Sequence, residues 1–201
     1  MKSSERLNSA TKSSILDAAK ATLLECGYAG LSTRKVAVAA DVPLSQLHYH
    51  FGSKRNMMLE LLETENRRLL ERQAEMFEGE APLWKQWEQA CDYLEEDLAS
   101  GYVRVLDEMI AVGWSDDEIA VAVRRQVRGW FDLLASVAER VQHRFGGFGP
   151  FTAQEVAALG GLPFLGAEIV ILLGIPEEAL PARSALRKMS LVIRAMEEGD
   201  V

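Results

Sequence analysis

Apolar residues recur at helical spacing along most of the 201-residue chain. Ile15, Ala19 and Leu23 lie four residues apart, as they would on one face of an α-helix, and Gly27 follows them as a stop signal. No run between turns alternates apolar and polar residues, which is the pattern of a half-buried strand. The sequence therefore predicts an all-α fold.

Three short helices and one long helix are predicted in the first 80 residues. The hydroxyls of Ser32 and Thr33 can cap the second helix, and a third helix follows over about residues 44–51. Ser53 can cap a long helix over about residues 54–77. Two short helices joined by a tight turn have the dimensions of a helix-turn-helix, whose second helix enters the major groove of DNA.

Five further helices are predicted beyond a boundary at residues 79–82, which brings the total to about nine. Short segments rich in glycine, proline or serine separate them. Their expected ranges are 83–99, 102–113, 116–145, 152–173 and 182–198. We divide the chain into a helix-turn-helix domain at residues 1–53 and a helical domain at residues 54–201, with residues 54–77 as the connecting helix.

The charge is distributed unevenly along the chain. The net charge of -8 argues against a nucleic-acid partner if the chain is taken as a whole. Residues 1–55, however, carry eight basic and four acidic side chains, a net charge of +4, and the remaining residues carry -12. This asymmetry suggests that only the amino-terminal quarter approaches a polyanion.

The sequence predicts neither a membrane span nor a signal peptide. No apolar run reaches the roughly 18 residues that a membrane span needs, and no apolar core follows the first residues. We therefore expect a cytoplasmic protein that makes no membrane contact. Cys26 and Cys91 are far apart in sequence, and we expect buried thiols in a reducing compartment.

Metal binding and catalysis find no support in the sequence. His48 and His50, two residues apart on a helix, point nearly opposite ways and cannot chelate one ion without distortion. No glycine-rich phosphate loop precedes a strand, and there is no nucleophile elbow. We therefore expect no metal, no cofactor and no catalytic residues, and the protein is not expected to be an enzyme.

Candidate DNA contacts gather at the start of the second helix and along the third. A helix amino terminus offers unpaired N–H donors and partial positive charge to a phosphate, and Lys54 can reach a phosphate as a point charge. Leu47 and Phe51 share a face that should anchor the third helix, which leaves Gln46 able to pair with adenine. The candidates are Ser32, Thr33, Arg34, Leu44, Ser45, Gln46, His48, Tyr49 and Lys54.

The residues of this region resemble the signature of the TetR family from Ile15 to Lys54 without a gap. The matching runs are Ile15-Leu16-Asp17-Ala18-Ala19, Gly27-Tyr28, Leu31-Ser32-Thr33-Arg34-Lys35-Val36-Ala37, Ala40-Asp41-Val42 and Leu47-His48-Tyr49-His50-Phe51-Gly52-Ser53-Lys54. The resemblance implies a repressor of nine helices, with a three-helix DNA-binding end and a body that binds a ligand and forms dimers.

One position departs from the family pattern. The family often has a tyrosine directly after the leucine of the third helix, where it meets a phosphate. Here that position is His48, and Tyr49 comes one residue later. Adjacent residues point about 100° apart on a helix, so the two cannot make the same contact. Which of them touches a phosphate stays open at this point.

The helical domain contains all four tryptophans. Core packing accounts for most of its apolar stripes, and the resemblance adds a ligand pocket between helices. The scarcity of lysine and arginine on these stripes favours a neutral or cationic, largely apolar effector, for which Glu108 is either a partner or a plain surface residue. The candidate lining residues are Trp87, Cys91, Met109, Trp130 and Phe131.

The last two helices each have a face suited to a partner. Packing within one chain could use both faces, whereas the resemblance favours a twofold interface of two helices from each subunit. Small residues leave the first of these helices thin, and the second carries an apolar stripe. The candidate interface residues are Gly160, Phe164, Ala167, Leu186, Met189, Ile193 and Met196.

We therefore expect a DNA-binding transcriptional regulator that acts as a ligand-released repressor and binds a palindromic double-stranded operator as a homodimer. An activator or a co-repressor-dependent regulator would share these sequence features. A helical small-molecule carrier would keep the pocket but would need no basic amino-terminal end.

Overall fold

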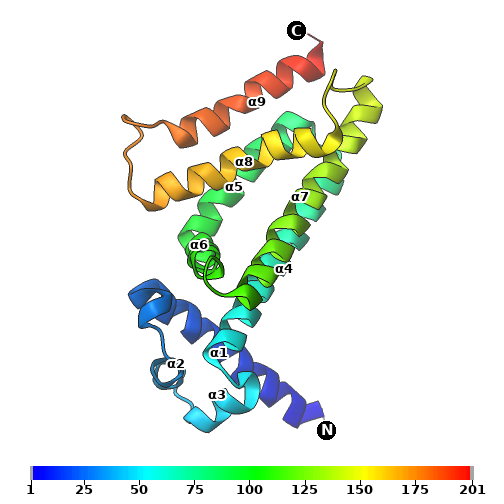
Figure 1. The fold of residues 1–201 in the computed structure, drawn as a ribbon. Coiled ribbons are helices and arrows are strands. Elements are labelled where there is room, and N and C mark those ends of the chain that lie inside the picture. Colours follow the sequence, from blue (N-terminus) through cyan, green and yellow to red (C-terminus); the bar gives the residue numbers. More distant parts are fainter. Residues whose placement is uncertain (1, 200–201) are drawn as a thin grey trace. The chain divides into compact units, whose positions relative to one another are not determined.

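The computed structural model describes residues 2–199, except the side chains of residues 2–7 and 144–145. Within that range the chain forms nine helices, and its only pairing of extended residues is a single bridge between Phe148 and Phe151. The predicted all-α fold with nine helices is confirmed for the described residues (Figure 1).

The helix bounds follow the glycine, proline and capping signals closely. From residue 83 onward, each observed helix begins and ends within one residue of the expected range. The helices are α1 (Lys2–Gly30), α2 (Thr33–Ala39), α3 (Leu44–Phe51), α4 (Lys54–Glu78), α5 (Leu83–Ser100), α6 (Tyr102–Gly113), α7 (Asp117–Phe145), α8 (Ala153–Leu172) and α9 (Ala182–Glu198).

The chain forms two compact units. The amino-terminal unit combines residues up to 67 with residues 104–124, and the carboxy-terminal unit combines residues 68–103 with residues 125 onward. Because the divisions fall inside α4, α6 and α7, each of these helices contributes residues to both units.

The amino-terminal unit is built around α1, α2 and α3, shown in blue to cyan in Figure 1. Its core contains Ile15 and Leu23 of α1, Val36 of α2 and Leu47 of α3, none of which is exposed to solvent. Met57 at the start of α4 is equally buried. The apolar stripes identified in the sequence thus meet in one core.

The sequence predicts that the first helix stops at Gly27. Instead, α1 bends there and continues to Gly30. Gly27 has φ 67° and ψ 172°, a left-handed conformation that glycine adopts without a steric penalty. The bend leaves the N–H of Tyr28 outside the helical hydrogen-bond ladder. This N–H donates to Oε2 of Glu108 on α6, 3.1 Å away. Glu108 therefore has a structural role in the amino-terminal unit.

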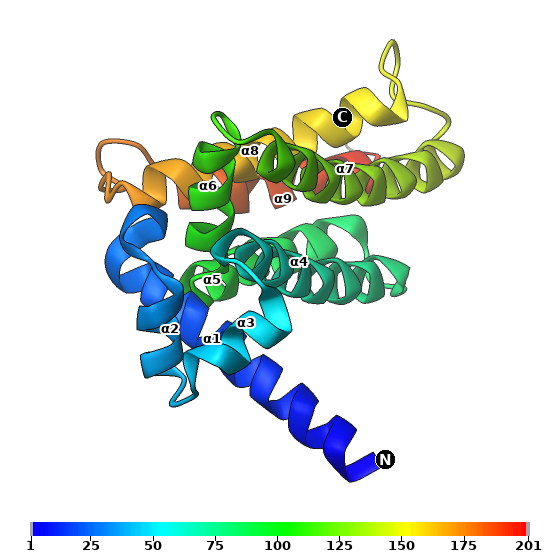
Figure 2. The same cartoon turned by 60° about the horizontal axis from the view of Figure 1, so that its bottom comes forward.

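The carboxy-terminal unit contains a core cluster formed by α5, α8 and α9. Its buried members are Cys91, Leu94, Phe164, Ala167 and Leu186. α8 and α9, yellow and orange to red, run beside each other in both views (Figures 1 and 2). A capping box between Thr152 and Glu155 fixes the start of α8.

α8 is long and apolar enough, by length and composition alone, to cross a membrane, which the sequence reading did not expect. Its mean hydropathy is 1.7 over the relevant window. One face nevertheless packs in the core of the carboxy-terminal unit through Phe164 and Ala167, and Glu168 interrupts the apolar sequence. Other apolar side chains of α8, among them Leu159 and Leu162, are exposed.

Candidate nucleic-acid interface

The start of α2 presents small polar groups at the surface. Ser32 caps the helix: its backbone is extended, and its Oγ accepts the N–H of Lys35 at 3.3 Å. A hydroxyl that accepts one hydrogen bond can still donate its own hydrogen. Arg34 is exposed and Thr33 half-buried, so three predicted phosphate-binding residues lie together at this end of α2.

α3 buries one face and exposes the other. Leu47 and Phe51 are buried, as predicted, and Leu44 beside them is half-buried. The other predicted contacts on α3 are exposed, and Tyr49 has 78% of its surface accessible. The buried pair fixes the rotation of α3 about its axis, so its outward face is polar. The exposed predicted contacts on this helix are Ser45, Gln46, His48 and Tyr49.

His48 is held by the residue that ends α3. Gly52 has φ 71° and donates its N–H to the carbonyl of His48 at 2.9 Å. In return, Nδ1 of the His48 ring lies 3.1 Å from the carbonyl oxygen of Gly52. A carbonyl oxygen can only accept, so Nδ1 carries the proton that makes this bond. The bond sets the orientation of the ring.

His50 packs between its two aromatic neighbours on α3. Its ring lies edge-on to Tyr49, with 5.3 Å between the centroids, and 5.9 Å from the ring of Phe51. The side chain is half-buried. The three rings form a short aromatic row along α3, which helps to hold Tyr49 in place while leaving most of it exposed.

Lys54 makes contacts within the protein that the sequence did not reveal. Its Nζ donates to the carbonyl of Tyr28 and lies 4.0 Å from the centroid of the Tyr28 ring. Burial lowers the pKa of this ammonium group. Lys54 thus braces the end of α1 against the start of α4. Its contact with a phosphate is not tested by these bonds and stays a prediction.

The start of α4 is also tied to α7. Ser53 caps α4 by accepting the N–H of Asn56 at 3.1 Å, as expected. The guanidinium of Arg55 pairs with Asp116 at 2.9 Å and with Glu118 at 2.7 Å. Sequence analysis missed this brace because its partners are some 60 residues apart and each looks like an ordinary surface charge.

Four of the five candidate ligand residues gather in the carboxy-terminal unit. Trp87 lies 5.2 Å from Phe164, centroid to centroid, and its Nε1 donates to the carbonyl of Leu186 at 2.7 Å. Trp130 donates to Oε1 of Gln73 at 2.8 Å and packs against Phe131. Both indole N–H groups are therefore satisfied within the unit.

These aromatic rings pack against Gly160 and Gly161 of α8. A Cβ on Gly160 would lie 3.8 Å from Trp87, and one on Gly161 would lie 2.6 Å from Phe131 and 3.1 Å from Trp130. Cys91 is buried in the neighbouring core cluster. Met109, the fifth candidate, is fully buried but belongs to the amino-terminal unit.

Residues 15–61 match the family model described as "Bacterial regulatory proteins, tetR family". The amino-terminal part of the chain is thus similar to the TetR family. The matched residues include the whole of α2 and α3, so the helix-turn-helix described above corresponds to the DNA-binding helix-turn-helix of TetR-family regulators. Among curated protein sequences, none matches the chain significantly.

Solved structures of regulators share the fold of this chain. A TetR-family transcriptional regulator from Rhodococcus sp. superposes with a TM-score of 0.76 at 20% identity, over 92% of this chain and 98% of the other. FadR from Bacillus subtilis, solved with stearoyl-CoA, superposes with a TM-score of 0.74 at 12% identity, over 88% of this chain and 96% of the other. A regulator from Saccharomonospora viridis, solved with choline, superposes with a TM-score of 0.74 at 20% identity, over 90% of this chain and 95% of the other.

The candidate dimer residues divide between buried and exposed positions. Phe164, Ala167 and Leu186 are buried in the core cluster of a single chain, which leaves less than a tenth of each side chain accessible to a partner. We therefore remove these three from the expected interface. Gly160 is half-buried against Trp87. Met189 and Met196 are exposed and Ile193 is half-buried.

Other apolar side chains on α8 and α9 are exposed. Those on α8 and its end recur at helical spacing and are Leu159, Leu162, Ile169 and Leu173. Those on α9 are Met189, Leu191, Val192 and Met196. Met189, Val192 and Met196 share one side of α9, whereas Leu191 lies on another side. We call the α8 set together with these three α9 residues the exposed α8–α9 face. Sequence periodicity missed the α8 set because that helix is apolar on nearly every side.

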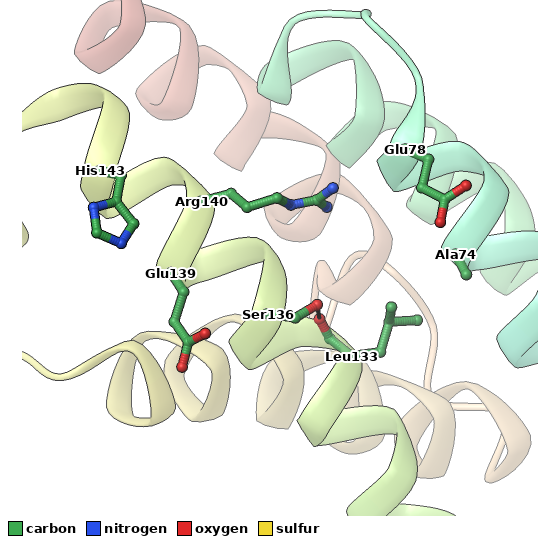
Figure 3. A pocket seen from close by; sticks show the side chains of 7 residues that line it. All are labelled: Ala74, Glu78, Leu133, Ser136, Glu139, Arg140 and His143. Atoms are coloured by element: carbon green, nitrogen blue, oxygen red, sulfur yellow. Dashed lines mark hydrogen bonds between the residues drawn. The ribbon is translucent and has the colours of Figure 1, made fainter.

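An open hollow of about 360 Å³ lies between α4 and α7 in the carboxy-terminal unit (Figure 3). Ala74 and Glu78 line it from α4. The lining residues from α7 are Leu133, Ser136, Glu139, Arg140 and His143. None of the candidate ligand residues is among them, so the predicted effector site remains with the aromatic residues around Gly161.

Proposed function

We propose that the protein is a ligand-released repressor that binds a palindromic operator as a homodimer in the cytoplasm. The observation that carries this proposal is the rotation of α3, which directs Ser45, Gln46 and Tyr49 outward beside the basic start of α2. Such an arrangement suits base contacts from α3 and phosphate contacts from Ser32, Thr33 and Arg34.

The exposed α8–α9 face supports the dimer. Soluble monomers rarely expose contiguous apolar patches of large size, and a twofold interface uses the same patch on both subunits. Leu162 and Val192, each about half exposed, represent the two helices. A twofold dimer carries two copies of α3, which is why we expect the operator to be palindromic.

The aromatic residues around Gly161 support the ligand. Trp87, Trp130 and Phe131 lie in the same unit, and two structural relatives were solved with an acyl-CoA and with choline. We propose that a largely apolar effector, neutral or cationic, separates these rings. α4 has residues in both units, so a shift of α4 would change the spacing of the two copies of α3 in the dimer.

The proposal is tested by selecting duplexes from a random pool with the full-length chain. We expect enrichment of a palindromic sequence, binding by two chains, and affinity that falls steeply as salt concentration rises. Stearoyl-CoA and choline serve as first effector probes in a thermal-shift screen. A compound that raises the melting temperature should weaken binding to the enriched duplex.

Each of the other outcomes would indicate a different function for the protein. Ligand binding without affinity for any duplex would indicate a carrier and contradict the proposal. A ligand that strengthens operator binding would indicate a co-repressor-dependent regulator. Operator affinity that is unchanged by every ligand that binds would contradict the ligand-released switch.

A further inference from the structure

We propose that His48 contacts a DNA phosphate as an imidazolium, so that binding to DNA takes up one proton per subunit. The inference rests on the proposed function, and it deepens that function by assigning the chemistry of one contact. Its origin is the bond between Nδ1 of His48 and the carbonyl oxygen of Gly52.

That bond determines what the other ring nitrogen can do. Because Nδ1 carries a proton to reach Gly52, Nε2 of a neutral ring has a lone pair and no hydrogen. A phosphate oxygen offers only acceptors. A neutral His48 in this orientation therefore cannot hydrogen-bond a phosphate through Nε2, and only the doubly protonated ring can do so.

The place of His48 on α3 favours a phosphate over a base. Successive helical residues point about 100° apart. Leu47 and Phe51 face the core, so Tyr49 and Ser45 point most directly away from it, while His48 lies at the side of the helix. A residue at the side of a helix that enters the major groove faces the sugar-phosphate wall of that groove.

The surroundings of α3 leave the His48 ring able to pair with a DNA phosphate. No carboxylate of the described residues forms an ion pair with His48. The charged side chains on the adjoining segments are mostly basic, and the acidic one in the turn is exposed. They include Lys12 of α1, Arg34 and Lys35 of α2, Asp41 of the turn, and Lys54, Arg55 and Glu60 of α4.

Several of these cations already have partners. Lys12 pairs with Glu60, Lys54 binds the carbonyl of Tyr28, and Arg55 pairs with Asp116. A phosphate beside the His48 ring favours its protonated form. The proton is therefore taken up when DNA binds, and operator affinity should rise as the pH falls.

The test measures affinity for a duplex enriched by the full-length chain, at constant ionic strength, between about pH 6 and about pH 8. We expect wild-type affinity to increase as the pH falls, by at most about tenfold per pH unit for each proton taken up. His48→Gln should bind with little pH dependence, because an amide donates to a phosphate without taking up a proton. His50→Gln is the matched control and should keep the wild-type slope.

A second measurement checks the ring itself in the free protein. Nitrogen NMR at about pH 8 should show His48 as the tautomer protonated at Nδ1. Circular dichroism of both variants should match the wild type, which separates a lost contact from a lost fold. A tautomer protonated at Nε2 would overturn the inference.

The remaining outcomes are decisive as well. A pH slope that survives in His48→Gln, or no slope in the wild type, overturns the inference while leaving the proposed function intact. Affinity that falls as the pH falls would mean that neutral Nε2 accepts a hydrogen from a base amino group, and would also overturn it. Failure to bind any duplex would instead overturn the proposed function.

Discussion

The carboxylate of Glu108 accepts the backbone N–H of Tyr28 at 3.1 Å, although the two residues are 80 positions apart. Its other oxygen is held by Arg104 at 2.8 Å. Glu108 therefore fixes the bend that Gly27 introduces into α1, and the Tyr28 carbonyl just beyond it binds Lys54. The helix-turn-helix is supported by α6 as well as by the three helices recognised in the sequence.

This support predicts the effect of removing the acceptor. Glu108→Ala leaves the Tyr28 N–H without its partner and should lower the free energy of unfolding by about 1–2 kcal/mol. Glu108→Gln keeps an acceptor oxygen and should cost less. Urea denaturation measures both variants. Equal stability of the wild type and Glu108→Ala would show that the bond contributes nothing.

A pair of glycines on α8 gives a matched test of close packing. Gly161→Ala places a Cβ 2.6 Å from Phe131 and 2.9 Å from Leu134, so these two side chains must move. We expect a loss of about 1–3 kcal/mol and altered tryptophan fluorescence. Gly166→Ala meets no atom within 4 Å and should be neutral or slightly stabilising. The same loss in both variants would contradict the packing argument.

The proposed dimer depends on the exposed α8–α9 face. Leu162→Glu puts a charge at the centre of the apolar set on α8 and should yield monomers, because an unpaired charge is costly in an apolar interface. Trp114→Glu changes an exposed apolar residue elsewhere and should leave the assembly unchanged. Light scattering after gel filtration measures both. A dimeric Leu162→Glu protein would place the interface elsewhere.

Sequence patterns predicted the helices well because local signals set their ends. Ser32 and Ser53 act as caps where expected, and Leu47 and Phe51 form the buried face of α3. Caps and periodic apolar residues are local, so one sequence displays them. The continuation of α1 beyond Gly27 was missed because it depends on Glu108, a distant residue.

The faces of α8 and α9 show where local signals fail. Phe164 and Leu186 were expected at a dimer interface and instead pack inside one chain, whereas Leu162 is exposed. α8 is apolar on nearly all sides, so periodicity cannot select which side faces its own core. The braces Lys54–Tyr28 and Arg55–Asp116 were missed because tertiary contacts set them.

Cys91 predicts a pH dependence of stability. Burial raises the pKa of its thiol from 9.0 to about 11. Between about pH 9 and pH 11 the unfolded chain releases this proton while the folded chain keeps it. The folded state then binds more protons, so the free energy of unfolding falls as the pH rises, by on the order of 2 kcal/mol.

Urea denaturation at about pH 8 and about pH 10.5 measures this loss of stability. Cys91→Ala should lose less stability over the interval than the wild type, whereas Cys26→Ala should lose as much as the wild type. Burial also raises the pKa of Tyr28, which contributes to all three proteins alike. An identical decline in Cys91→Ala would show that the Cys91 thiol has the same pKa in the folded and the unfolded chain.

The central claim is that the outward face of α3 reads DNA bases. The most direct measurement is the affinity of the wild type and of Gln46→Ala for the enriched duplex and for a scrambled duplex, at one salt concentration. Gln154→Ala, an exposed glutamine on α8, is the matched control. We predict that Gln46→Ala binds the enriched duplex about tenfold more weakly, while its affinity for the scrambled duplex is unchanged. An equal loss on both duplexes, or equal wild-type affinity for both, would contradict base reading by α3.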